Sequence, residues 1–407
     1  MTDKMVWLWL SLHFGAGSKI YRKLYNHFDS VKDIFECDDA DVELIPGLRD
    51  SDKNRLLDKS TKSAELIMKW CEKYDVEILT PSDEKYPLPL RVLENFPAVL
   101  YCIGELPDFQ NKLCITVVGS RDMSALGRDN AFELGYGLTK GGALVISGMA
   151  KGIDTAAQKG AMFAGGSTIA VLGCGINYIY PQENEEVYKK ILKVGAAITE
   201  YPPDTPPTGS NFPVRNRLLA GLSSAVVVVE ARRDSGAAIT ARRGQEQRKK
   251  VLAFPGRTND YHSSGNNQLL IDGAEAVTNA VDVLEKFMDI YNDSIDIMAA
   301  KLRPNKNDKA SNVRYQFKEG FLYERRKSNR SNTPILAPKP SFEAKEFDTS
   351  KLDEETKLVY NSMKPGIPVN VNSFKNLNVD DDKIASILGL LEILGAITEN
   401  NGFYMKK

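Results

Sequence analysis

Apolar residues follow three successive patterns along the chain, and the middle pattern is the most regular. From residue 112 to about residue 288, short β-branched runs alternate with longer stretches that carry apolar residues at helical spacing. Such alternation predicts an α/β fold, in which a parallel, doubly wound sheet has helices on both faces. The predicted strands are 114–119, 143–146, 167–172, 196–199, 225–229 and 251–254. The predicted helices between them are 124–140, 153–164, 182–192, 214–222 and 236–248.

The first pattern, over residues 1–80, has Leu, Ile, Phe and Trp at helical spacing and predicts a helical domain. Glycine turns at residues 14–19 and 44–48 separate its helices. A glycine turn followed by a helix resembles the helix-hairpin-helix, whose turn amides can hold a DNA phosphate, and the domain is also similar to SAM-type helical modules. A small bundle with glycine-capped helices gives the same pattern. Phosphate binding and simple packing are therefore both open.

Two polar stretches flank the α/β region. Five prolines between residues 81 and 112 predict a connecting segment at the start of the second domain, 81–288. From residue 289 to residue 350 the apolar periodicity fades, and Lys, Arg, Asn, Ser and Pro dominate. This composition predicts a basic disordered linker.

The last segment, 351–407, recovers an ordered pattern. Helices are predicted at 357–363 and 382–394, followed by two short strands around a hairpin turn at 399–402. This arrangement resembles a small winged helix. Its second helix has Lys383 as its only basic residue, whereas a helix that reads DNA would carry more positive charge. The pattern therefore favours a protein-interaction or regulatory role for this domain.

The balance of positive and negative residues excludes a general attraction to polyanions. Lys and Arg number 53 against 54 Asp and Glu, so any polyanion must be bound by a local patch. The five cysteines form no CxxC pair, which predicts reduced thiols in the cytoplasm and no metal site. The apolar run near the N-terminus is interrupted by Ser11 and His13, so we expect neither a signal peptide nor a membrane span.

Hydroxyl and basic side chains recur where the predicted strands end, as in loops 119–122, 147–154 and 235–240. The carboxyl ends of parallel strands share one edge of the sheet, where ligands of doubly wound folds lie. Pro213 suits the first turn of a helix and would place the next three polar residues in that turn. Ser235 is a plausible N-cap. Helix N-termini flanked by guanidinium groups form a site for an anion.

Each candidate also has a purely structural explanation. Arg121 or Arg217 could pair with a nearby carboxylate, the choices being Asp122, Glu200 and Glu230, and Lys151 could be a solvated lysine at a helix start. Gly148, Gly152 and Gly236 could be required only by the backbone conformation of their turns. Three aromatic residues, Tyr178, Tyr180 and Phe212, could carry stacked bases or belong to the core.

Several motifs of catalytic or nucleotide-binding proteins are missing from the sequence. No GxxxxGK[ST] loop occurs, and no GxGxxG follows the first predicted strand, so the usual phosphate loops of NTP hydrolysis and dinucleotide binding are absent. The three histidines lie outside the strand-end loops, which removes the commonest general acid–base group. Cys174 has no histidine nearby in the sequence to make it a nucleophile.

A series of motifs resembles the DNA-processing protein A family over about residues 80–288. The series is Gly-Ser-Arg (119–121), Ser-Gly-Met-Ala-Lys-Gly-Ile-Asp (147–154), Ile-Ala-Val-Leu-Gly-Cys-Gly (169–175), Glu-Tyr-Pro-Pro (200–203), Phe-Pro-Val-Arg-Asn-Arg (212–217), Val-Glu-Ala (229–231), Ser-Gly-Ala-Ala-Ile-Thr (235–240) and Phe-Pro-Gly (254–256). One departure is Gln158, where the family commonly has His in the second motif.

The resemblance implies an extended Rossmann-like domain that binds single-stranded DNA without sequence preference and has no enzymatic activity or cofactor. It further implies a homodimer that protects incoming DNA and loads the RecA recombinase during natural transformation. Carried over motif by motif, the residues of the DNA-binding pocket are Arg121, Ser147, Gly148, Lys151, Arg215, Asn216, Arg217, Ser235, Gly236 and Thr240.

Two other classes of function are open on the sequence. One is a nucleotide-binding Rossmann enzyme, such as a phosphoribohydrolase of the lysine-decarboxylase-like family, although that family's Pro-Gly-Gly-x-Gly-Thr motif is absent. The other is a regulatory scaffold that acts through the terminal modules.

Overall fold

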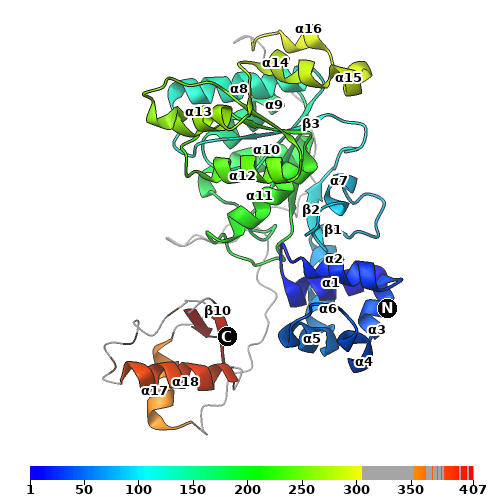
Figure 1. Cartoon of the computed structure of the whole chain (residues 1–407), viewed down its shortest axis with the longest axis vertical. Helices are drawn as coiled ribbons and strands as arrows, with labels where there is room; N and C mark the ends of the chain where they lie inside the picture. Colours follow the sequence, from blue (N-terminus) through cyan, green and yellow to red (C-terminus); the bar gives the residue numbers. More distant parts are fainter. Residues whose placement is uncertain are drawn as a thin grey trace. The chain divides into compact units, whose positions relative to one another are not determined.

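The computed structural model describes residues 1–304, 352–363, 369, 374, 377, 380–393, 396–400 and 403–406. The chain forms two compact units, Met1–Pro338 and Lys339–Lys407. Figure 1 labels the elements of both units.

A nine-stranded sheet is the centre of the first unit, with the order β1-β2-β6-β5-β4-β3-β7-β8-β9. All neighbours from β6 to β9 pair in parallel. The chain winds from β3 towards β6 and then returns to place β7 beside β3, so the winding direction changes between β3 and β7. The strands are β1 Glu77–Leu79, β2 Leu100–Gly104, β3 Cys114–Val118, β4 Leu144–Ser147, β5 Thr168–Val171, β6 Ala196–Thr199, β7 Ala225–Val228, β8 Lys250–Ala253 and β9 Glu275–Ala276.

The predicted doubly wound α/β sheet is confirmed, and each of the predicted strands ends within one residue of its observed bounds. One part of the prediction is wrong. The segment 81–112 contains β2, which pairs antiparallel with both β1 and β6 and so extends the sheet. Prolines flank β2 on both sides, and this composition predicts a connecting segment rather than a strand of the sheet.

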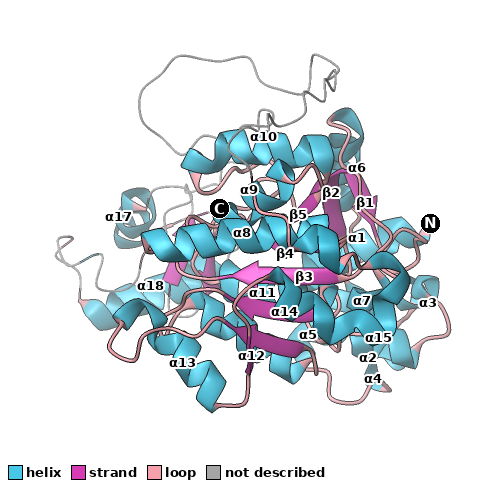
Figure 2. Ribbon diagram, turned by 90° about the horizontal axis from the view of Figure 1, so that it is seen from above, coloured by secondary structure: helices cyan, strands magenta, loops and turns pink. Residues whose placement is uncertain are grey.

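Helices cover both faces of the sheet (Figure 2). Alternate residues of one strand point to opposite faces, and the core divides accordingly. Val226 and Val228 belong to one hydrophobic cluster, whereas Ala225 and Val227 belong to the other. The helices of this region are α8 Ala125–Lys140, α9 Ile153–Phe163, η1 Gln182–Asn184, α10 Glu185–Val194, α11 Asn211–Leu222, α12 Gly236–Glu246, η2 Tyr261–Ser263 and α13 Ser264–Ile271.

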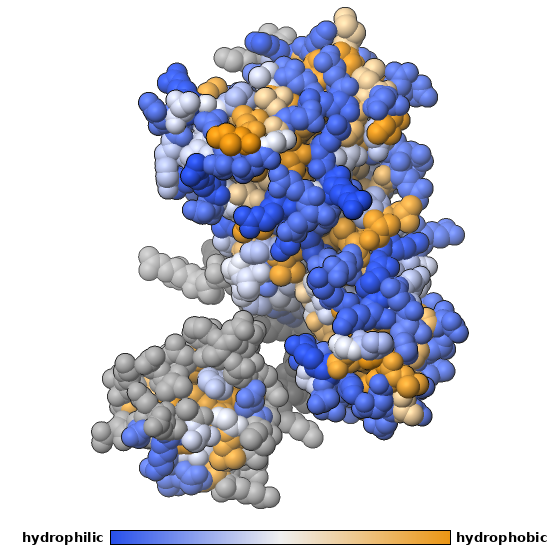
Figure 3. Space-filling model, in the orientation of Figure 1, coloured by the Kyte–Doolittle hydropathy of each residue, from blue (hydrophilic) through white to orange (hydrophobic). Residues whose placement is uncertain are grey.

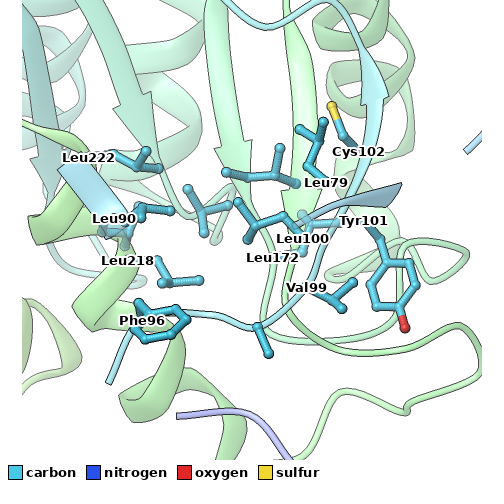
Figure 4. Close-up of a cluster of buried hydrophobic side chains, with 14 of the residues drawn as sticks. Leu79, Leu90, Phe96, Val99, Leu100, Tyr101, Cys102, Leu172, Leu218 and Leu222 are labelled. Atoms are coloured by element: carbon cyan, nitrogen blue, oxygen red, sulfur yellow. The ribbon is translucent and has the colours of Figure 1, made fainter. Parts of the chain in front are cut away.

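The N-terminal helices share the larger of these two clusters with the sheet. Trp7 and Trp9 of α1 are buried in the same cluster as Leu100 of β2 and Leu218 of α11, and Figure 4 shows the part around β1 and β2. The helices of residues 3–73 therefore pack onto the sheet as part of one core, and residues 77–79 already belong to the sheet as β1. The helices are α1 Asp3–Phe14, α2 Ile20–His27, α3 Val31–Glu36, α4 Asp39–Glu43, α5 Asp50–Leu57, α6 Lys62–Lys73 and α7 Leu88–Arg91.

The chain continues in packed structure beyond residue 288, where the sequence predicts the linker. Ala300 is buried in the cluster that contains α8, and a Cβ on Gly142 would lie 2.1 Å from the carbonyl oxygen of Ser294. Residues 305–350 of the predicted linker lie outside the described residues. The last elements of this unit are α14 Ala280–Leu284, η3 Glu285–Phe287, α15 Met288–Tyr291, η4 Asn292–Ser294 and α16 Ile297–Ala300.

The second unit has its own small core. Val359, Leu388 and Leu391 are buried together with Ile397 of the hairpin. Its elements are α17 Glu354–Ser362, α18 Asp381–Ile393 and the antiparallel strands β10 Ile397–Asn400 and β11 Phe403–Lys406. Lys383 pairs with Glu355 at 2.5 Å, so the one basic residue noted in this helix is already partnered. The resemblance to a winged helix stays a prediction.

Among the described residues, no helix is both long and apolar enough to cross a membrane. Figure 3 shows one face of the molecule, on which hydrophilic residues separate the apolar patches.

Candidate nucleic-acid interface

A cleft of about 1030 Å³ opens where the winding direction of the sheet changes. It is lined by the loop after β3, the first half of α11, the loop after β7, the first turn of α12, and residues Tyr180 and Tyr261. This is the position at which doubly wound sheets bind ligands. Six of the ten predicted site residues line the cleft: Arg121, Arg215, Asn216, Ser235, Gly236 and Thr240.

Arg215 lies at the floor of the cleft and is 4% exposed. Its Nη1 donates to the carbonyl oxygen of Gly148 at 3.0 Å and also to that of Val171. Burial lowers the pKa of Arg215, although the carboxylate of Asp154 opposes this effect. An arginine starts from so high a pKa that it stays protonated, so the floor of the cleft holds a guanidinium cation, with Asp154 beside it.

Asp154 is the acidic neighbour of this arginine. Its Oδ2 accepts hydrogen bonds from the amides of Gly148 at 3.0 Å and Ala150 at 3.4 Å. Burial raises the pKa of Asp154, while the charge of Arg215 and the two amides oppose that rise. Asp154 therefore organises the loop after β4, and its charge opposes the effect of burial on Arg215.

The N-terminus of α12 presents free donors to the cleft. The first amides of a helix have no partner within the helix, and Ser235 caps only the amide of Ala238, at 3.3 Å. The side chain of Asn216 donates to the carbonyl oxygen of Gly236 at 3.2 Å and so joins α11 to this turn. Within the described residues, no carboxylate accepts a hydrogen bond from the amides of Gly236 or Ala237. An anion can therefore bind there.

The helix after β3 is different, because an internal carboxylate already occupies its N-terminus. Glu230 accepts a hydrogen bond from the amide of Ser124 at 2.9 Å and another from its hydroxyl. A Cβ on Gly127 would lie 2.4 Å from Glu230 Oε2. Of these two helices, α12 is therefore the one whose N-terminus is open to the cleft.

Aromatic and cationic groups meet at one side of the cleft. The guanidinium carbons of Arg121 and Arg215 lie 5.2 and 5.8 Å from the centre of the Phe212 ring. Tyr180 is 39% exposed, and its ring centre is 5.4 Å from that of Phe212. Both rings line the cleft, whereas Tyr178 packs against the hydrophobic core.

The other four predicted site residues do not line the cleft. Ser147 is fully buried and donates to the carbonyl oxygen of Val117. Gly148 lies beneath Arg215, and a Cβ there would lie 2.7 Å from its Nη2. Lys151 is exposed in the loop after β4, with its Nζ 3.4 Å from Glu183 Oε1.

Arg217, the fourth, forms a buried ion pair with Glu200 at 2.5 Å, which is one of the partners considered from the sequence. The second carboxylate oxygen of Glu200 accepts from the amide of Gly17 at 3.0 Å. Burial raises the pKa of Glu200, and the positive charge of Arg217 opposes that rise. The first glycine turn therefore holds an internal carboxylate through this amide, which favours the packing interpretation of that turn.

One sequence-based placement is wrong. Arg215, Asn216 and Arg217 were expected in the first turn of their helix, but α11 already begins at Asn211. They lie in its second turn, where their amides are bonded within the helix, so only their side chains are available to a ligand. Pro213 does lie in the first turn of α11. Because proline is tolerated at every position of a first turn, its presence does not show at which residue the helix begins.

Among the lining residues that the sequence analysis did not select are two arginines and a tyrosine. Arg232 and Arg233 follow β7, and Tyr261 lies in η2. The rule that cations after a strand end face the cleft would have found the two arginines. Tyr261 lies several residues beyond β8 and has no such signal.

Gln158, the departure from the family motif, is fully buried and lies outside the cleft. Its Nε2 donates to the carbonyl oxygen of Ile169 at 3.2 Å, so it joins α9 to β5. The described residues contain no cluster of His, Cys, Asp or Glu that could hold a metal ion. Burial raises the pKa of Cys174 to about 12, which leaves its thiol protonated and unreactive.

Comparisons with known proteins agree on the region of the chain that forms the sheet. The family model described as DNA recombination-mediator protein A matches residues 77–288, which include every strand of the nine-stranded sheet. Protein Smf of Escherichia coli is 37% identical over 248 residues, which cover 61% of this chain and 66% of that protein. DNA processing protein DprA of Streptococcus pneumoniae is 38% identical over 205 residues, which cover 50% of this chain and 72% of that protein.

The X-ray structure of DNA processing protein A from Streptococcus pneumoniae has a similar fold. It superposes with a TM-score of 0.61 at 30% identity, over 70% of this chain and 98% of that chain.

Proposed function

This chain belongs to the DNA recombination-mediator protein A family, and we propose on that basis that its cleft binds single-stranded DNA and that it acts as a recombination mediator without enzymatic activity. The family expected from the strand-end motifs is thereby confirmed. The function of this chain is our proposal, and one observation carries it: the open N-terminus of α12 lies in the same cleft as Arg121, Arg215 and the Phe212 ring.

These groups suit the two chemical parts of a single strand. The α12 amides and the guanidinium groups can bind successive phosphates, because both are fixed donors that favour negative charge. The Phe212 and Tyr180 rings offer faces to unpaired bases, a contact that any base can make. In a duplex the base faces are covered by neighbouring pairs. The cleft should therefore prefer single strands and show little sequence preference.

We extend the proposal to the finer properties that the family resemblance implies. These are a homodimer, protection of incoming strands, loading of RecA during natural transformation, and a winged-helix role in protein contacts. The loading step is tested by measuring how fast RecA assembles filaments on single strands that are coated with single-strand binding protein, with and without this chain. An unchanged assembly rate would contradict it.

Binding itself is tested with single-stranded and double-stranded oligonucleotides of the same sequence. We expect a mobility shift with the single strand at much lower protein concentration. Arg121→Ala should weaken that binding, while Arg128→Ala is a matched control, because Arg128 is exposed on α8 outside the cleft and pairs with Asp129. Equal affinity of wild type and Arg121→Ala, or no binding of single strands, would contradict the proposed site.

The proposed lack of enzymatic activity is tested separately. Asp154 and Glu230 are committed to backbone and hydroxyl donors, so neither is free to act as a base. Incubation with nucleoside monophosphates should release no free base. Release of a base that depends on the protein would support the phosphoribohydrolase alternative.

A further inference from the structure

We infer that the cleft holds a second nucleobase platform, formed by Tyr261 together with Arg232, on the side opposite Phe212 and Tyr180. This inference rests on the proposed function, because it assigns where further bases of the same strand would stack. It adds a binding group that the sequence motifs do not contain.

The sheet order places the two platforms on opposite sides of the cleft. Tyr180 follows β5 and Tyr261 follows β8, and β4, β3 and β7 lie between these strands. Four strand spacings separate β5 from β8, which amounts to about 19 Å. Both side chains nevertheless line the same cleft. A strand bound across the cleft would therefore meet one aromatic group on each side.

Tyr261 stands exposed on a well-fixed turn. It is 67% exposed, so its ring has a free surface. Asp260 fixes the backbone below it by accepting from the amide of His262 at 2.9 Å and from the hydroxyl of Ser263 at 3.1 Å. The hydroxyl of Ser264 donates to the carbonyl oxygen of Tyr261 at 2.8 Å. A base that stacks here would meet a preorganised ring, with little ordering cost.

Arg232 completes the platform. Its guanidinium carbon lies 4.7 Å from the centre of the Tyr261 ring. Its Nη2 donates to Asp122 Oδ2 at 3.1 Å, so a carboxylate from the loop after β3 holds the cation over the ring. The same combination of ring and guanidinium occurs at Phe212 with Arg121. Two such groups in one cleft point to a strand whose bases are splayed to both sides.

Intrinsic fluorescence tests the contact directly. The three native tryptophans, Trp7, Trp9 and Trp70, are at most 6% exposed, so an indole introduced by Tyr261→Trp would be the exposed one. We expect a saturating thymidine oligonucleotide to quench its emission, because a stacked base quenches an indole, while an abasic oligonucleotide of equal length should not. Tyr25→Trp is the matched control, since Tyr25 is 50% exposed on α2 outside the cleft, and its emission should not change.

Affinity provides the second readout. Tyr261→Leu should weaken binding of the base-containing strand by about 5- to 150-fold, the effect of one lost base–aromatic stack. It should leave binding of the abasic strand unchanged, and Tyr261→Phe should bind like the wild type. If Tyr261→Leu binds both strands like the wild type and the introduced indole is not quenched, the platform is overturned while the proposed function stands. If the wild type binds neither strand, both the second platform and the proposed function are contradicted.

Discussion

Gly148 and Gly236 both adjoin the cleft, but the structure needs a glycine only at the first. A Cβ on Gly148 would lie within 2.8 Å of the guanidinium group of Arg215, so a side chain there would displace the cation at the floor. A Cβ on Gly236 would have no atom within 4 Å, and its φ is not positive. The free space at Gly236 is therefore available for a ligand that approaches the backbone.

Gly236→Ala should separate stability from binding. We expect the free energy of unfolding to stay equal or to rise by about 0.4–1 kcal/mol, because the unfolded chain loses conformational freedom. We expect single-strand affinity to fall about 10-fold or more, since the methyl group would block charge-assisted hydrogen bonds to the amides. Denaturant unfolding and fluorescence anisotropy measure the two effects. Gly148→Ala is the contrasting control and should destabilise by about 1–3 kcal/mol. Unchanged affinity in Gly236→Ala would place the strand away from this turn.

At the level of single residues, the sequence predicts the cleft only where a motif follows a strand end directly. Arg121 and Ser235 were found in this way. Arg217 shows the limit, because residues two positions apart on a helix differ by about 200° in direction. Arg215 therefore faces the cleft while Arg217 turns towards Glu200. The sequence names the charged residue, but the face it occupies depends on how the helix packs.

At the level of elements, the Glu200–Arg217 pair joins the first glycine turn, the loop after β6 and α11 in one buried contact. Arg217→Met removes the cation and leaves a buried carboxylate. Breaking such a pair costs about 3–5 kcal/mol at neutral pH. The pKa of Glu200, already raised by burial, should rise further, because its opposing charge is lost.

The stability loss of Arg217→Met should grow with pH. A carboxyl whose pKa is higher in the folded state stabilises the fold only while it is protonated, and that contribution is lost as pH rises above the ordinary glutamate value of about 4.3. Denaturant unfolding at pH 5 and pH 8 measures the difference. The double variant Glu200→Gln with Arg217→Met should be less pH-dependent. Equal losses at both pH values would contradict a buried carboxylate.

The elements were predicted where their pattern is complete. The run at β7 is apolar on both faces, which is typical of a buried strand. Every strand predicted from such a pattern is present in the structure. The antiparallel strands β1 and β2 were not predicted as part of the sheet. β1 has only three residues and β2 lies among prolines, so neither run is long enough to show the period of a strand. The packing of α16 was missed for the same reason, since a helix of four residues has no periodicity.

At the level of the whole molecule, the net charge of −1 provides no general attraction to a polyanion, so the proposed binding relies on the local charge of the cleft. Four arginines line it: Arg121, Arg215, Arg232 and Arg233. Single strands lose affinity with salt at a slope of about −0.7 for each neutralised phosphate. We therefore expect a plot of log K against log salt concentration to have a slope no steeper than about −3.

Arg121→Ala should make that slope shallower by about 0.7, because one phosphate contact is lost. Arg217→Met should leave the slope unchanged, since its guanidinium is buried with Glu200 and does not line the cleft. Anisotropy titrations of one fluorescent oligonucleotide across a series of salt concentrations measure all three slopes, with Arg128→Ala as the control for an exposed arginine elsewhere. A wild-type slope much steeper than −3 would show that cations beyond the cleft bind the strand. A shallower slope in Arg217→Met would show that the ion pair opens to release its arginine to the DNA.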